Sequence, residues 1–199
     1  GITVIWGMEM RFPENGNDYL LYGIDENDIK ALYDFTSTDF VTFYKGFKND
    51  KNLIVSFHYY NPLFITHYGA WWTPMKDYKD KVEYPGVFAP PAAFYDKLDY
   101  KIVNQFKSDE GIWNKEYLLK QIQPCIDKAN ELGLQLYCGE FGAYPYYLDK
   151  EPRLNWYRDV CAIFREHNIA NAHWCYKGDF PIVDDDLQPN EIPEILLGK

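Results

Sequence analysis

The sequence lacks the features that mark membrane proteins and proteins that bind nucleic acids. No apolar run approaches the roughly 20 residues of a membrane-spanning helix, and the first residues, Gly-Ile-Thr-Val-Ile-Trp-Gly, have no basic region. We therefore expect no membrane segment and a signal peptide that is absent or already removed. Basic residues are scarce, with 20 Lys and Arg against 30 Asp and Glu. The formal charge of -10 disfavours attraction to nucleic acid phosphates or anionic membranes and favours a neutral or cationic partner.

Cysteine and histidine are also too few and too scattered to form a metal site or a disulfide framework. The four cysteines contain no Cys-x-x-Cys motif, which favours buried free thiols over disulfides or a metal site. These are Cys125, Cys138, Cys161 and Cys175. The four histidines show no His-x-x-x-His spacing. We expect neither a metal nor a cofactor.

Aromatic residues, by contrast, are abundant, with 18 Tyr, 13 Phe and 6 Trp. Burial in a core explains most of them, but a surplus of Tyr and Trp also suits a cleft that stacks on sugar faces. The chain of 199 residues can form one domain, residues 1–199, whereas a complete eight-fold β/α barrel usually needs about 250 residues.

Apolar runs bounded by turn residues alternate with longer amphipathic stretches. This alternation predicts an α/β fold with a parallel sheet. The expected helices cover Asn114–Leu132, which begins with an Asn cap, and Pro152–His167. The expected strands are Ile2–Trp6, Leu53–Tyr59, Leu134–Cys138 and Ile169–Trp174.

Residues 68–109 are rich in Pro, Tyr and Lys and read as one long loop within the domain. Loops of this length in a compact domain are usually functional or disordered. Its seven Tyr and Trp residues favour a functional loop.

Chemistry-bearing residues gather where three of the expected strands end. One strand ends in Ser-Phe-His58-Tyr-Tyr60-Asn-Pro, the next in Gly-Glu140-Phe-Gly and the last in His-Trp174-Cys-Tyr-Lys177-Gly. A carboxylate at the end of a buried strand is poorly solvated and persists only with partners. Barrel enzymes keep their active sites at such strand ends.

In order and spacing, these segments resemble the last strands of a cellulase-type glycoside hydrolase of family 5. The likeness runs from about Asn52 to the end of the chain. It includes a loop with Thr-His67 and Gly-Ala-Trp-Trp72, which resembles the Thr-His-x-Gly-Ala-x-Trp loop of endoglucanases. The resemblance implies a (β/α)8 TIM-barrel fold and retaining hydrolysis of β-1,4-glucosidic bonds in a cellulose-like polysaccharide, without metal or cofactor. It also implies an extracellular, secreted enzyme.

The resemblance assigns a role to each of these residues. Glu140 matches the family's nucleophile, and the His-x-Tyr pair formed by His58 and Tyr60 matches the groups that hold it. Residues i and i+2 of a strand share a face, so both can reach one pocket. Trp174 matches the tryptophan beneath the sugar that is cleaved, and Lys177 a polar sugar contact. His67 and Trp72 belong to the substrate-binding set through their loop.

One family motif is missing. The acid/base glutamate of the family lies in an Asn-Glu-Pro motif upstream of the His-x-Tyr strand, and none precedes His58. Glu9, in the apolar segment Thr3–Met10, is a weak candidate because its neighbours do not match. We therefore expect the chain to resemble the C-terminal half of a barrel, about strands five to eight.

A half barrel without the acid should be weak or inert alone, because general acid catalysis is typically worth about 10² to 10⁴-fold. Its exposed sheet edges predict a homo-oligomer or pairing with a complementary N-terminal half. The alternative function is an inactive carbohydrate-binding or assembly half barrel.

Overall fold

The computed structural model describes residues 6–11, 18–23, 49 and 54–198. The chain divides into two compact units, each made of three separate segments of the sequence. Unit 1 comprises Gly1–His58, Ile122–Glu140 and His167–Ala172, and unit 2 comprises Tyr59–Gln121, Phe141–Glu166 and His173–Lys199.

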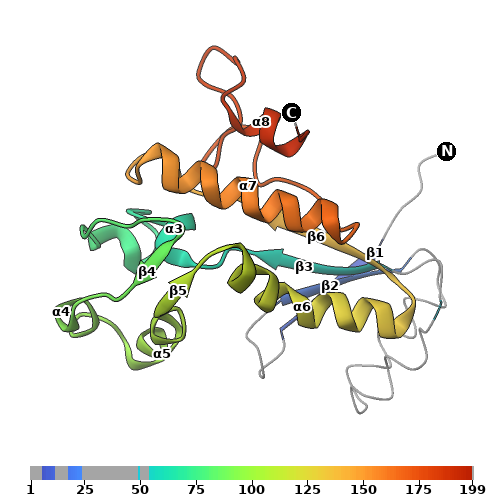
Figure 1. Cartoon of the computed structure of the whole chain (residues 1–199), viewed down its shortest axis with the longest axis horizontal. Helices are drawn as coiled ribbons and strands as arrows, with labels where there is room; N and C mark the ends of the chain where they lie inside the picture. The colour runs from blue at the N-terminus through green and yellow to red at the C-terminus, as the bar shows by residue number, and fades with distance from the viewer. Residues whose placement is uncertain (1–5, 12–17, 24–48, 50–53, 199) are drawn as a thin grey trace. The chain divides into compact units, whose positions relative to one another are not determined.

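A five-stranded sheet forms the framework of unit 1, in the strand order β1-β2-β3-β6-β7; Figure 1 labels the first four of these strands. β6 and β7 pair in parallel, as an α/β fold requires. β1 with β2, and β2 with β3, pair antiparallel. The strands are β1 (Trp6–Arg11), β2 (Asp18–Gly23), β3 (Ile54–Tyr59), β6 (Gln135–Phe141) and β7 (Ala170–Asn171).

The antiparallel pairs differ from the parallel sheet that the sequence predicted. Only the residues 12–17 separate β1 from β2. A parallel crossover needs a dozen or more residues, so a connection of this length allows only antiparallel pairing. β2 was not predicted at all, although its Tyr-Leu-Leu-Tyr core between Asp18 and Gly23 has the composition of a strand. Most of the expected strand Ile2–Trp6 lies outside the described residues.

The two predicted long helices are confirmed. α6 (Lys115–Leu132) begins after Asn114, whose side-chain oxygen accepts the backbone N–H of Tyr117 at 2.9 Å. That bond satisfies one of the free N–H groups at the helix start. α7 (Lys150–Glu166) buries one apolar face, and α8 (Ile192–Leu196) packs against the helix (Figure 1). The buried residues of that face include Leu154, Tyr157, Val160, Cys161 and Phe164.

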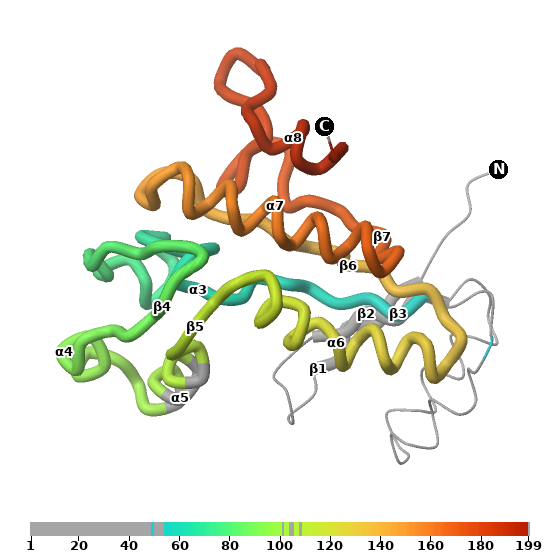
Figure 2. Tube along the Cα trace, viewed as in Figure 1, coloured from blue at the N-terminus to red at the C-terminus, as the bar shows by residue number. Residues whose placement is uncertain are grey.

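Residues 68–109, predicted as one loop, instead contain several short elements of unit 2, which Figure 2 traces in green. Their aromatic side chains, with those of α3 (Leu63–Thr66), build a core of their own: the ring of Phe64 lies 5.4 Å from those of Phe88 and Phe106. The residues that make these contacts are far apart in sequence, so no local sequence pattern predicts them. The elements are η1 (Pro74–Asp77), β4 (Gly86–Phe88), α4 (Ala92–Tyr95) and α5 (Tyr100–Ser108), followed by β5 (Gly111–Trp113).

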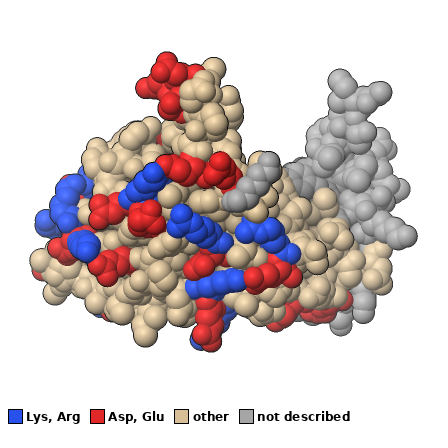
Figure 3. Space-filling view, turned by 45° about the horizontal axis from the view of Figure 1, so that its top comes forward, with Lys and Arg blue, Asp and Glu red and all other residues tan. Residues whose placement is uncertain are grey.

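The described part of the chain carries charges of both signs interspersed over the face drawn in Figure 3. Its four cysteines are free thiols, three of them buried. Within the stretches that the structure describes, every helix is too short or too polar to cross a bilayer.

Candidate active site

In unit 1, Glu140 on β6 lies beside His58 on the neighbouring strand β3. Nδ1 of His58 is 3.6 Å from Oε2 of Glu140. The two side chains are 22% and 30% exposed, so a ligand can reach the carboxylate while the imidazole stays next to its charge. The structure therefore brings together two residues that are 82 positions apart in sequence. Their catalytic roles remain predictions.

The two glycines that flank Glu140 serve the packing of the protein. A Cβ on Gly139 would lie 3.1 Å from Oγ of Ser56 and 3.4 Å from Nε2 of His58, so the glycine lets β3 approach. In unit 2, a Cβ on Gly142 would overlap the carbonyl oxygen of Trp174. Neighbouring protein atoms therefore occupy the space beside both glycines.

In unit 2, Tyr60 belongs to a cluster of aromatic rings. Its ring lies 5.3 Å from that of His67 and 5.8 Å from that of Phe180. Trp72 joins the cluster through His67 at 6.1 Å and through Tyr144 at 5.0 Å. Three of the predicted site residues, Tyr60, His67 and Trp72, are thus neighbours.

His67 is the polar member of this cluster. Its Nδ1 lies 2.9 Å from the hydroxyl of Thr66, and burial lowers its pKa to about 4. The ring is therefore neutral above that pH. A neutral imidazole suits an uncharged ligand better than a charged imidazole would.

Trp174 is anchored by its backbone and exposes its ring. Its N–H donates to the carbonyl oxygen of Phe141, the residue after Glu140, at 3.0 Å. The side chain is 48% exposed, whereas neighbouring His173 lies against the hydroxyl of Tyr157, with 2.9 Å between Nε2 and the oxygen. This contact gives His173 a structural role. A tryptophan ring with this exposure can accept a flat apolar sugar face.

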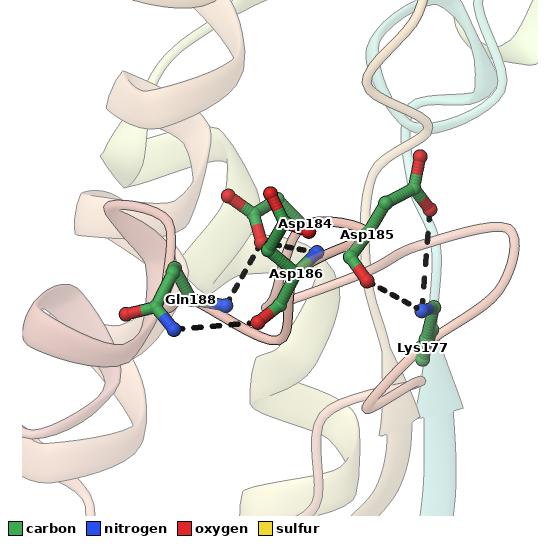
Figure 4. A network of polar contacts seen from close by, with 5 residues as sticks. All are labelled: Lys177, Asp184, Asp185, Asp186 and Gln188. Carbon is green, nitrogen blue, oxygen red and sulfur yellow. Dashed lines mark hydrogen bonds and ion pairs between the residues drawn. The ribbon is translucent and has the colours of Figure 1, made fainter.

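Lys177 is held within its own loop (Figure 4). Its Nζ donates to the carbonyl oxygen of Asp185 at 3.3 Å and lies 4.0 Å from the carboxylate of that residue. The carboxylate of Asp184 accepts the backbone N–H groups of Asp186 and Gln188, so a local turn presents Asp185 (Figure 4). A sugar contact by Lys177 would compete with this ion pair, which makes it the weakest of the predicted contacts.

Three residues of the site were not singled out from the sequence. Tyr144 and Phe180 form the buried floor of the aromatic cluster, and Tyr157 bonds to His173. In the sequence, Tyr157 is only one of several residues on the apolar face of a helix. Tyr144 and Phe180 lie in irregular segments, where no periodicity distinguishes a site residue from a loop residue.

The register of the sheet gives no support to Glu9 as the acid. Glu9 pairs with Leu20, and Leu20 pairs with Ser56. Three strand spacings thus separate the backbones of β1 and β6, about 14 Å along a flat sheet. Retaining glycosidases need their two carboxyl groups only about 5 to 5.5 Å apart.

Among the described residues, no three His, Cys, Asp or Glu side chains gather as a metal site.

Known proteins resemble the chain in both sequence and fold. Endoglucanase C of Acetivibrio thermocellus is 34% identical over 152 residues, which cover 74% of this chain and 44% of that protein. Cellodextrinase A of Ruminococcus flavefaciens is 27% identical over 122 residues, 61% of this chain and 29% of that protein. Over about three-quarters of its length, the chain is therefore similar to endoglucanases and to cellulases of glycoside hydrolase family 5. No model of a known protein family matches it.

A solved structure of the family supports the fold. Thermotoga maritima Cel5A in complex with cellobiose superposes with a TM-score of 0.52 at 23% identity, over 74% of this chain and 40% of that protein. The fold is therefore α/β and related to that of the family 5 cellulases. The chain spans less than half the length of the curated relatives that it matches.

Proposed function

We propose that the chain hydrolyses β-1,4-glucosidic bonds in a cellulose-like polysaccharide with retention of configuration, and that Glu140 is the nucleophile. The observation that carries the proposal is the 3.6 Å approach of His58 Nδ1 to the Glu140 carboxylate at a strand end. The likeness to endoglucanases supports the same assignment.

The reaction proceeds in two displacements. A carboxylate oxygen of Glu140 attacks the anomeric carbon, the glycosidic C–O bond breaks, and the leaving oxygen takes a proton from the acid/base group. Water then attacks the same carbon, gives its proton back to that group and releases the carboxylate. His58 and Tyr60 orient Glu140, and Trp174 stacks beneath the sugar. His67, Trp72 and Lys177 contact further parts of the glucan.

The acid/base group is supplied from outside these 199 residues, by a longer form of the enzyme or by a second chain. Two observations support this proposal: the Asn-Glu-Pro motif is missing upstream of His58, and Glu9 lies three strands from β6. The enzyme acts outside the cell on polymeric β-glucan, as a secreted protein. The rival function is a non-catalytic half barrel that binds carbohydrate, which the same missing motif favours.

A mechanism-based label tests the nucleophile without needing the acid. A fluorinated cellobioside with a dinitrophenolate leaving group needs no protonation of that group, so an intact nucleophile forms a trapped glycosyl ester. We expect mass spectrometry to find this ester on Glu140. Glu140→Gln should abolish it, and Glu194→Gln, which changes an exposed glutamate of α8, should keep it. Binding of cellotetraose without any label would support the binding module instead.

A further inference from the structure

A hollow of about 600 Å³ lies among η1, α4 and the start of α5, all within unit 2. Ligand sites in proteins usually measure about 300 to 1,000 Å³. The predicted nucleophile and its histidine do not line this hollow. It is built by residues 68–109, the segment whose composition predicts a functional loop.

Two adjacent tryptophans line the hollow. Trp71 is 72% exposed, the highest exposure among the large hydrophobic side chains of the described residues. Its ring lies 5.7 Å from that of Trp72, nearly perpendicular to it at 81°. Tryptophan carries a large apolar surface, so this degree of exposure points to a stacking platform.

The charges around the hollow are balanced. Three lysines and three aspartates line it, namely Lys76, Lys79, Lys97, Asp77, Asp80 and Asp99. Nζ of Lys79 donates to the carbonyl oxygen of Lys76, which keeps one of these cations at the wall. An anionic ligand would meet the carboxylates and a cationic ligand the ammonium groups. A neutral ligand rich in hydroxyl groups can use both as acceptors and donors.

Packed aromatic rings form the lining beneath these polar groups. Tyr78 and Phe94 line the hollow and lie 5.1 Å apart, and both contact Phe64, at 5.3 and 6.1 Å. Tyr78 is buried, which raises its pKa to about 12, so it stays neutral. The lining is thus preformed, which limits the conformational entropy lost on binding.

Trp72 connects the hollow to the aromatic cluster of Tyr60 and His67. It lines the hollow and also contacts His67 and Tyr144 with its ring. We propose that this hollow is a second binding site for neutral oligosaccharides, with Trp71 as its stacking platform. The choice of a β-glucan as its ligand rests on the proposed function, while the preference for a neutral, hydroxyl-rich ligand rests on the lining alone.

Indole N–H resonances test the proposal locally. In uniformly ¹⁵N-labelled protein carrying Glu140→Gln, which prevents turnover, cellohexaose should shift the indole signal of Trp71, assigned by its loss in Trp71→Phe. The indoles of Trp113 and Trp156 are buried and bonded to carbonyl oxygens, so their signals should stay in place as internal references. Trp71→Ala should weaken cellohexaose binding about ten-fold, as expected for a lost stacking ring. Ile112→Ala, which removes a similarly exposed apolar side chain outside the hollow, should not.

The outcomes separate this site from the catalytic proposal. A shift of Trp174 without any shift of Trp71 overturns the second site and leaves the proposed function standing. A shift of Trp71 together with failure of the covalent label on Glu140 supports the second site and overturns the nucleophile. Tighter binding of an oligogalacturonate than of cellohexaose at the Trp71 signal would overturn the preference for a neutral ligand.

Discussion

The hydroxyl of Tyr157 lies 2.9 Å from Nε2 of His173 and accepts the backbone N–H of Ala143 at 2.8 Å. One side chain of α7 thus ties the segment that follows β6 to the segment that follows β7, within unit 2. Burial is the main cause that lowers the pKa of His173 to about 4, so this link is made by a neutral imidazole. Trp174 is the next residue, which makes Tyr157 a positioning residue for its loop.

Tyr157→Phe should remove both hydrogen bonds while keeping the ring. Ala143 N–H and His173 would each lose a buried partner, so we expect the free energy of unfolding to fall by about 1 to 3 kcal/mol. Urea unfolding measures the change. Tyr146→Phe, at an exposed tyrosine, is the matched control and should stay within about 0.5 kcal/mol of wild type. Equal stability of the two variants would show that the hydroxyl of Tyr157 does not hold these segments together.

Trp174→Ala should weaken the binding of cellotetraose by about 1 to 3 kcal/mol if the exposed ring is a stacking surface for sugar. Isothermal titration beside a thermal melt separates binding from packing, and Trp174→Phe should retain part of the affinity. Unchanged affinity with a large fall in melting temperature would instead assign the ring to the core.

Asp109→Asn should change how stability depends on pH. Burial raises the pKa of Asp109 to about 7, and the N–H of Leu63 offsets this only in part. Between about pH 4 and pH 7 the unfolded chain has lost this proton while the folded protein retains it. The contribution of Asp109 to stability is therefore present at low pH and is lost as the pH rises to about 7.

An asparagine cannot lose that proton, so the melting temperature of Asp109→Asn, relative to wild type, should rise between pH 5 and pH 8. One pKa unit corresponds to about 1.4 kcal/mol, and 1 kcal/mol shifts the melting temperature of a domain of this size by about 2 to 4 °C. We therefore expect several degrees. Asp96→Asn, at an exposed aspartate, should show no such trend. A constant difference across this range would contradict the raised pKa.

The chain alone should associate in solution. β1 and β7 stand at the two ends of the strand order that the structure describes, and such strands present backbone groups that can pair with another chain. Light scattering over a concentration series should find a dimer or a larger species, or a co-purifying segment that carries the acid. A monomer that hydrolyses soluble cellulose at full rate would contradict both the predicted association and the proposal that the acid/base group is supplied from outside these residues.

The sequence predicted the parts of this protein that depend on local patterns. Asn114 and Gly133 mark the ends of α6, and the apolar spacing of residues 154–164 gives the buried face of α7. The strand ends placed His58 and Glu140 as a candidate pair, and the structure joins them at 3.6 Å. Neighbours along a helix or strand determine these features, so their signals survive in the sequence alone.

Only the tertiary structure decided the rest. The antiparallel pairing of β2 with β3, the short elements within residues 68–109 and the hollow beside Trp71 all arise from contacts between segments distant in sequence. The raised pKa of Asp109 likewise follows from its burial, which the neighbouring residues in the sequence do not predict. Sequence alone shows which side chains are available, whereas burial and long-range packing determine which of them meet and which lose their water.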